Sequence, residues 1–491
     1  MHSTTSPLLV DDIWYILIDI LSHPPPADDS DYEENYDDRW RPKKLDKVVP
    51  YLRDLINLSS SCKWLRDLLA PRIFGSLYLY NTAKSALSIQ AIAKGKHSGY
   101  VQSLHYIAAC EQDQQNSPLE QICPPELDTV LSNLSQFPHL RHISVEFPFD
   151  YDGEWWESKS QDYFDPSHER ALAEEAENAW LGLMASSFTS LVSNSPVHIR
   201  SLEIHHLNIA EISTFTSPEF PRFLSQLQSF NLSIRPWDNG VGWHLNTQQN
   251  FDGFADRLGP WFTEHLSSVE EFTLDPSNSS VLGNALQPYC HDISLRNSHM
   301  PSLRKLTLRN IIICVELRDF IIRHLETIEE VSLHECYAIT GWANDSDSEA
   351  LTWLDLFAAL SKACSSSPTA ALQTLDLSYD KSQLEMLDLD DSWAEIQDLI
   401  AQAGEKLATQ PRARAFFYAD VDDKYGYRFR DTETNLARYL QGDDEMGYRE
   451  FLAVLTLKAR RVTGGRGGSV SEGEDKRGLK RRNSEVDGVQ G

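Results

Sequence analysis

An apolar-x-x-apolar-x-apolar pattern recurs eight times along the chain, from about residue 101 to about residue 377. The last two apolar positions of each copy alternate with polar ones, which is the period of a strand with one buried face. The copies are Val101/Leu104/Tyr106, Leu140/Ile143/Val145, Ile199/Leu202/Ile204, Leu227/Phe230/Leu232, Val269/Phe272/Leu274, Leu303/Leu306/Leu308, Ile328/Val331/Leu333 and Leu372/Leu375/Leu377. The pattern therefore predicts eight short strands.

Several of the gaps between these copies show the spacing of an amphipathic helix. The apolar residues that carry it are Leu172, Ala176, Trp180, Leu183, Phe188 and Leu191 in one gap; Phe251, Phe254, Leu258, Trp261 and Phe262 in another; and Leu351, Leu354, Phe357 and Leu360 in a third. A strand, a crossover helix and a second strand form the unit of a parallel sheet. Repeated eight times, this unit predicts an α/β solenoid with strands inside and helices outside.

The gaps range from about 25 to about 59 residues, so the repeats are longer and less regular than standard leucine-rich repeats of about 20–29 residues. A doubly wound α/β enzyme would produce a similar alternation and is the main alternative fold. Against that alternative, no predicted strand is followed by a glycine-rich phosphate-binding motif.

Two helices are predicted before the repeats. The first follows the cap residues Ser6 and Pro7 and is apolar on two sides; the second runs from about Asp54 to Ala70, has one apolar face, and is expected to stop at Pro71. A helix that is apolar on two sides needs cover on two sides. The second helix covers one side, so the other must contact the following domain or a second protein.

The second helix resembles the second half of an F-box, where an apolar helix carries a Cys-Lys-x-Leu/Trp-Arg signature. Here the residues are Cys62-Lys63-Trp64-Leu65-Arg66, and the segment Ala70 to Leu79 resembles the exit segment common in fungal F-box proteins. The first helix is similar to the first half of the motif, although Leu9-Val10 stands where Leu-Pro is usual. Val331 to Thr340 looks like the cysteine-containing type of leucine-rich repeat that commonly follows an F-box.

This resemblance, to fungal-type F-box proteins with degenerate leucine-rich repeats, implies a non-catalytic subunit of an SCF-type (cullin–RING) ubiquitin ligase that recognises substrates. Its F-box would dock on a Skp-type adaptor. By analogy of position, the adaptor-binding residues would be Leu9, Ile13, Leu58, Trp64 and Leu65. Two alternatives stay open: a repeat scaffold unrelated to ubiquitin, and an α/β hydrolase-like or carbohydrate-active enzyme.

Changes in composition divide the chain into three parts. Residues 7–75 form the helical domain, with an acidic insertion at about 23–45 that is expected to be solvated. Residues 76–461 form the solenoid, and residues 462–491, rich in glycine and charge, are expected to be disordered. A basic cluster in this tail suggests nuclear import.

The polar residues between the buried strand positions should face the concave surface of the solenoid. They are either a solvated sheet face or, taken as a row, a surface that binds a protein substrate. The candidates are His142, Glu203, His205, Asn231, Glu271, Lys305, Arg309, Glu330 and His334. Trp155 and Trp156, in an acidic and aromatic segment between two repeats, would either anchor a partner or tuck beneath their own loop.

Charge and motifs narrow the function classes further. Acids outnumber bases by 73 to 44, a net charge of -29, which disfavours nucleic acid as a partner. No apolar run is long enough to span a membrane. The seven cysteines include no C-x-x-C pair, so neither a disulfide framework nor a cysteine zinc site is expected, and the cytoplasm or nucleus suits the chain best.

No catalytic, cofactor-binding or metal-ligating residue is predicted. Asp420, Asp422 and Asp423 begin like a calcium loop, but Lys424 and Tyr425 occupy the positions that need a ligand and a glycine. This segment is therefore expected to be a solvated turn.

Overall fold

The computed structural model describes residues 50–109, 119–148, 168–194, 199–236, 242–277, 279–284, 288–339, 351–389 and 394–464. The first predicted helix with Leu9 and Ile13, the acidic insertion, the segment with Trp155 and Trp156, and the tail all lie outside these residues.

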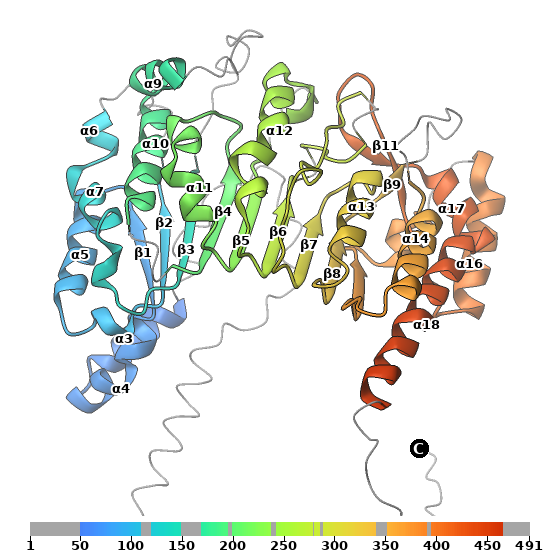
Figure 1. Ribbon diagram of the computed structural model, residues 1–491, viewed down its shortest axis with the longest axis horizontal. Helices are drawn as coiled ribbons and strands as arrows, with labels where there is room; N and C mark the ends of the chain where they lie inside the picture. The colour runs from blue at the N-terminus through green and yellow to red at the C-terminus, as the bar shows by residue number, and fades with distance from the viewer. Residues whose placement is uncertain are drawn as a thin grey trace, which may run out of the picture.

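A nine-stranded parallel sheet forms the centre of the molecule, and its strands follow one another in chain order (Figure 1). They are β1 (Ser76–Tyr80), β2 (Ser103–Ile107), β3 (His142–Glu146), β4 (Ser201–Leu207), β5 (Ser229–Ile234), β6 (Glu271–Asp275), β7 (Lys305–Arg309), β8 (Glu330–His334) and β10 (Thr374–Ser378). All eight predicted strands are present, which confirms an α/β fold. The ninth, β1, lies in the segment interpreted above as the exit from an F-box.

Two rows of apolar side chains run across the whole sheet in register. One row is Leu77, Leu104, Ile143, Leu202, Phe230, Phe272, Leu306, Val331 and Leu375, and the other is Leu79, Tyr106, Val145, Ile204, Leu232, Leu274, Leu308, Leu333 and Leu377. Every member is buried. These are the last two apolar positions of each repeat. The need to bury them on one face therefore explains both the sequence pattern and the register of the sheet.

The helices that alternate with the strands pack on the face that carries these two rows (Figure 1). They include α5 (Ala83–Lys94), α7 (Pro125–Leu131), α10 (Ala179–Val192), α11 (Glu219–Leu224), α12 (Gln249–Trp261), α13 (Val315–Arg323) and α14 (Trp353–Ser366), with the short α6 (Leu119–Ile122) before α7. The helix α9 (His168–Glu177) packs against α10 instead. On the opposite face the described strand side chains are half-buried or exposed, except Ser144 and Thr307. We call this the open face.

The strand order contradicts the doubly wound alternative. A doubly wound sheet reverses its order at an internal switch point and carries helices on both faces. Here the order never reverses among the described strands, and the buried side chains lie on one face.

Two helices that the sequence predicted as single are each divided in the structure. The segment predicted over Asp54–Ala70 forms α3 (Pro50–Ser59) and α4 (Lys63–Ile73), because Cys62 leaves helical geometry and its Sγ caps the N–H of Leu65. Pro71 does not stop α4 but lies inside it, so the helix continues to Ile73 without the backbone hydrogen bond that residue 71 would otherwise donate. Similarly, Asn178 separates α9 from α10 with an extended backbone.

The C-terminal part adds structure that the sequence pattern did not predict. A small sheet combines β9 (Ala338–Ile339), β11 (Tyr418–Val421) and β12 (Arg428–Arg430), and β11 and β12 form a hairpin. Around it lie α15 (Gln383–Met386), α16 (Gln397–Thr409), α17 (Thr432–Gln441) and α18 (Asp443–Gly464). The buried Trp353 donates its indole N–H to the carbonyl of Phe417 at 2.9 Å, which joins this part to α14.

None of the helices in the described residues has both the length and the apolar character needed to cross a bilayer.

The buried rows predict which substitutions on one strand damage the fold. Leu306 is fully buried in the first row, whereas Lys305, its neighbour on the same strand, is exposed on the open face. We expect Leu306→Ala to lower the free energy of unfolding by about 2–5 kcal/mol, because it leaves a cavity, and Lys305→Ala to change it by about 0.5 kcal/mol or less. Chemical denaturation of both variants checks this, and equal effects would contradict the assignment of faces.

Candidate functional site

A cavity of about 940 Å³ lies at the carboxyl ends of β4 to β8, on the open face of the sheet. The strands contribute His205, Asn231, Ser233, Thr273, Asp275, Arg309 and His334 to its wall. His206 near the end of β4 and residues that follow β7 and β8, including Asn310, Glu335 and Tyr337, also line it, together with Asp380, Lys381 and Met386. The β11–β12 hairpin supplies Tyr427, Arg428, Phe429 and Arg430.

The backbone departs from strand geometry at a repeated position beside the cavity. His206, Asn310 and Glu335 each follow the fifth residue of their strand, and each has a left-handed φ, at 53°, 55° and 49°. Proline cannot adopt a positive φ, so in the repeat of β6, where Pro276 holds this position, the left-handed residue comes one place later, at Ser277. These turns point polar side chains into the cavity.

A chain of hydrogen bonds crosses the rim and ends at Arg428. The carboxylate of Asp275 accepts from the Nδ2 of Asn310 at 2.8 Å, and the Oδ1 of Asn310 accepts from Nη2 of Arg428 at 3.2 Å. The guanidinium of Arg428 also lies 4.3 Å from the ring centroid of Tyr337 and donates to the main-chain oxygen of Glu335. The guanidinium is therefore held by neutral oxygens and an aromatic ring.

The carboxylate of Glu335 forms hydrogen bonds with residues beside it. Its carboxylate accepts from the hydroxyl of Tyr337 and from the N–H of Asp380, both at 2.6 Å. Burial raises the pKa of the Tyr337 hydroxyl although the positive charge of Arg428 opposes this, so the hydroxyl keeps its proton at neutral pH.

Arg430, next to Arg428 on the face of β12 turned the same way, is held in a different manner. It donates to the carbonyls of Glu385 and Met386 at 3.1 Å and pairs with Asp388 at 3.4 Å. Of the two hairpin arginines, only Arg430 has a carboxylate partner among the described residues.

His334 and Arg309 are neighbours in register on β8 and β7. Burial, and secondarily the positive charge of Arg309, lowers the pKa of His334, so its imidazole is neutral at pH 7. Its Nδ1 shares a hydrogen bond with the hydroxyl of Ser378 on β10. The ring therefore serves as a hydrogen-bonding group in the wall rather than as a cation.

The hairpin is anchored at its tip by Asn246, which donates to the carbonyls of Gly426 and Tyr289 at 2.9 and 2.8 Å. Beyond this anchor, Tyr427 and Phe429 remain 38% and 40% exposed. The hairpin thus presents two aromatic rings beside the charged wall.

The predicted row of nine open-face residues is divided by the structure. His205, Asn231, Arg309 and His334 line the cavity, whereas His142, Glu271, Lys305 and Glu330 are the first residues of their strands and lie at the opposite end. Glu203 lies in mid-strand between His205 at 3.2 Å and His142 at 3.7 Å. The hydrogen bond with His205 is the main reason why the pKa of Glu203 is lowered.

The acidic segment was compared only with a calcium loop and interpreted as a solvated turn, so the hairpin residues on either side of that turn were missed at the sequence level. Asp422 instead caps the hairpin turn, accepting from the N–H groups of Lys424 and Tyr425. The alternation of aromatic residues and arginines from Tyr427 to Arg430 was the available signal for a strand with two different faces.

The predicted adaptor-binding residues that the structure describes differ in exposure. Trp64 is 45% exposed and Leu58 is half-buried, but Leu65 is only 5% exposed and so does not contribute an outward-facing side chain. Leu55 and Leu69 form the centre of a small apolar cluster within α3 and α4 that is separate from the main core.

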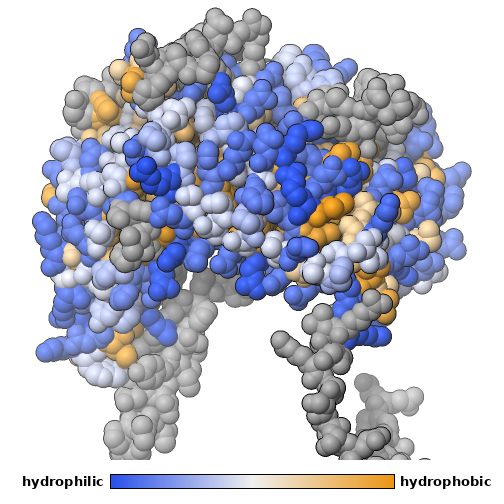
Figure 2. Space-filling view, in the orientation of Figure 1, coloured by the Kyte–Doolittle hydropathy of each residue, from blue (hydrophilic) through white to orange (hydrophobic). Residues whose placement is uncertain are grey.

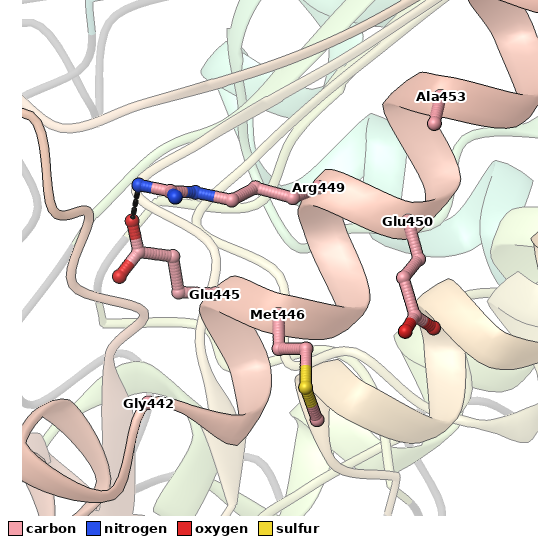
Figure 3. A pocket seen from close by; sticks show the side chains of 6 residues that line it. All are labelled: Gly442, Glu445, Met446, Arg449, Glu450 and Ala453. Atoms are coloured by element: carbon pink, nitrogen blue, oxygen red, sulfur yellow. Dashed lines mark hydrogen bonds and ion pairs between the residues drawn. The ribbon is translucent and has the colours of Figure 1, made fainter.

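A second, shallower pocket of about 430 Å³ lies on the outer side of α18 (Figure 3). It is lined by Gly442, Glu445, Met446, Arg449, Glu450 and Ala453. Glu445 and Arg449 pair with each other at 2.5 Å, and Glu450 adds a second carboxylate to the lining.

No group of three or more histidine, cysteine, aspartate or glutamate residues in the described part of the chain is arranged to hold a metal ion. The surface seen in Figure 2 is mostly hydrophilic. A scan against models of known protein families finds no match, and a search of curated proteins finds no significantly similar sequence.

The anchored turn of the hairpin makes Gly426 a sensitive position. Its φ is 71°, and an added Cβ would lie 2.5 Å from Cγ2 of Thr247 and 2.7 Å from Oδ1 of Asn246. We expect Gly426→Ala to destabilise the protein by about 1–3 kcal/mol, measured by thermal unfolding. Gly404→Ala, in α16 with nothing within 4 Å, is the control and should be neutral or slightly stabilising. An unchanged melting temperature for Gly426→Ala would contradict the anchored turn.

Proposed function

We propose that the chain is a substrate-recognition subunit of an SCF-type ubiquitin ligase, in which α3 and α4 belong to an F-box that docks on a Skp-type adaptor. The repeats would form a leucine-rich-repeat-like solenoid whose open face binds a protein substrate. The observation that carries this proposal is the exposure of large apolar side chains on α3 and α4.

This pair leaves large apolar side chains partly exposed. Ile56 on α3 is 44% exposed and Trp64 on α4 is 45% exposed, although a buried large side chain contributes about 1.5–3 kcal/mol of stability. Buried aromatic anchors near the centre of an interface carry much of its affinity. A partner protein that covers Trp64 and Ile56 would account for their exposure.

The position of α3 and α4 also supports separate binding sites for an adaptor and a substrate. α4 ends at Ile73, directly before β1, so the helices connect to the first strand of the sheet. The cavity lies at the carboxyl ends of β4 to β8, away from that first strand. An adaptor on α3 and α4 and a substrate in the cavity would therefore occupy different parts of the molecule.

Co-purification with a Skp-type adaptor tests the proposal. We expect the full chain to capture the adaptor and Trp64→Asp or Leu58→Asp to reduce capture by about tenfold or more, because a charge would be buried at the interface. These positions are preferable to Leu65, which is buried and whose substitution would disturb the fold itself.

Leu457→Asp is the matched control, because Leu457 is 54% exposed on α18 and belongs to no proposed contact. It should capture the adaptor like the native chain. If the native chain captures no adaptor, the ubiquitin-ligase proposal is wrong and the interaction-scaffold alternative is favoured.

A further inference from the structure

We propose that the cavity at the carboxyl ends of β4 to β8 binds an acidic segment of a protein, whose carboxylate or phosphate is held by Arg309 and Arg428. An aromatic or aliphatic side chain of the same segment packs on Tyr427 and Phe429. The inference deepens the proposed function, since the cavity becomes the substrate site, but it can be tested without the adaptor.

The guanidinium of Arg428 is preorganised to bind an anion. It is half-buried, stacked on Tyr337 and hydrogen-bonded to Asn310, so the entropy of ordering a long side chain is already lost on folding. Its protein partners are neutral oxygens, and none of the described carboxylates forms an ion pair with it. Guanidinium groups bind carboxylates and phosphates through charge-assisted hydrogen bonds.

The cavity lining holds further charged groups, and its cations (Arg309, Lys381, Arg428 and Arg430) outnumber its carboxylates (Asp275, Glu335 and Asp380) by four to three. Arg309 and Lys381 also lie in the wall, and no described carboxylate forms an ion pair with either. The carboxylates of Asp275 and Glu335 accept hydrogen bonds from neutral donors: Asn310 and the N–H of Ser277 in the first case, Tyr337 and the N–H of Asp380 in the second. This small excess of cations contrasts with the net charge of -29 of the whole chain.

The shape of the cavity favours a protein segment over a single small anion. About 940 Å³ lies at the upper end of the range of about 300–1,000 Å³ for ligand pockets, far more than one phosphate fills. Asn231, Ser233 and Thr273 line it with amide and hydroxyl groups, and the exposed rings of Tyr427 and Phe429 border it. A polynucleotide is disfavoured because the remaining surface carries the negative charge of the chain.

A fluorescein-labelled random copolymer of glutamate and tyrosine is the first probe, used with the purified full chain in a polarisation assay. We expect saturable binding that weakens as salt is added. A second arm uses the same copolymer phosphorylated on tyrosine, and a third uses inorganic phosphate as competitor. Tighter binding of the phosphorylated copolymer assigns a phosphate as the preferred anion, and equal binding assigns a carboxylate.

Arg309→Glu is the principal variant, because its exposed side chain can change without disturbing the core, and we expect it to weaken binding about tenfold or more. Lys305→Glu is the matched control: it makes the same change of charge on the same strand and face, but outside the cavity. We expect it to change binding by about twofold or less. Phe429→Ser tests the aromatic contact separately and should also weaken binding.

Three results would overturn the inference. They are no saturable binding of either copolymer, equal losses with Arg309→Glu and Lys305→Glu, or competition by an RNA oligonucleotide as strong as that by unlabelled copolymer. Adaptor capture is measured on the same preparations. If the native chain binds the copolymer but captures no adaptor, the ubiquitin-ligase proposal is rejected and this inference stands. If it captures the adaptor but does not bind the copolymer, this inference is rejected and the ubiquitin-ligase proposal stands.

Discussion

The two buried apolar rows determine most of this structure. Each strand contributes one side chain to each row, and a shift of register by one residue would move both side chains to the open face. All nine strands are therefore locked to one another by the same requirement, namely that the helices cover one face. The other face is consequently left to polar residues, which is why a binding surface can form there without loss of core.

How much of this was predictable depends on whether the signal was local. The eight strands follow from a three-position pattern within six residues, and each was predicted correctly. β1 carries the same pattern in Phe74, Leu77 and Leu79, but it was interpreted through the resemblance to an F-box instead. The helix breaks at Cys62 and Asn178 were missed because a single non-helical residue does not visibly interrupt the helical spacing of the apolar residues around it.

The cavity was only half predictable. The alternation of polar and apolar residues correctly placed Arg309 and His334 on the open face. It could not show which end of each strand lies at the cavity, so Lys305 and Glu330, at the other end, were included as well. Arg428 lies 118 residues from Asn310 in sequence, and no periodicity links them. Their contact depends on the parallel pairing of β9 with β11, which a single sequence does not reveal.

The order in which the chain is made gives this long-range contact a further consequence. α3 and α4 complete their own small cluster from residues between 50 and 73, whereas the cavity needs a guanidinium that is added more than three hundred residues later. Domains generally fold from the N-terminus during synthesis. A ribosome-bound chain thus exposes α3 and α4 well before the cavity exists, and a prematurely ended chain would keep these helices without the cavity.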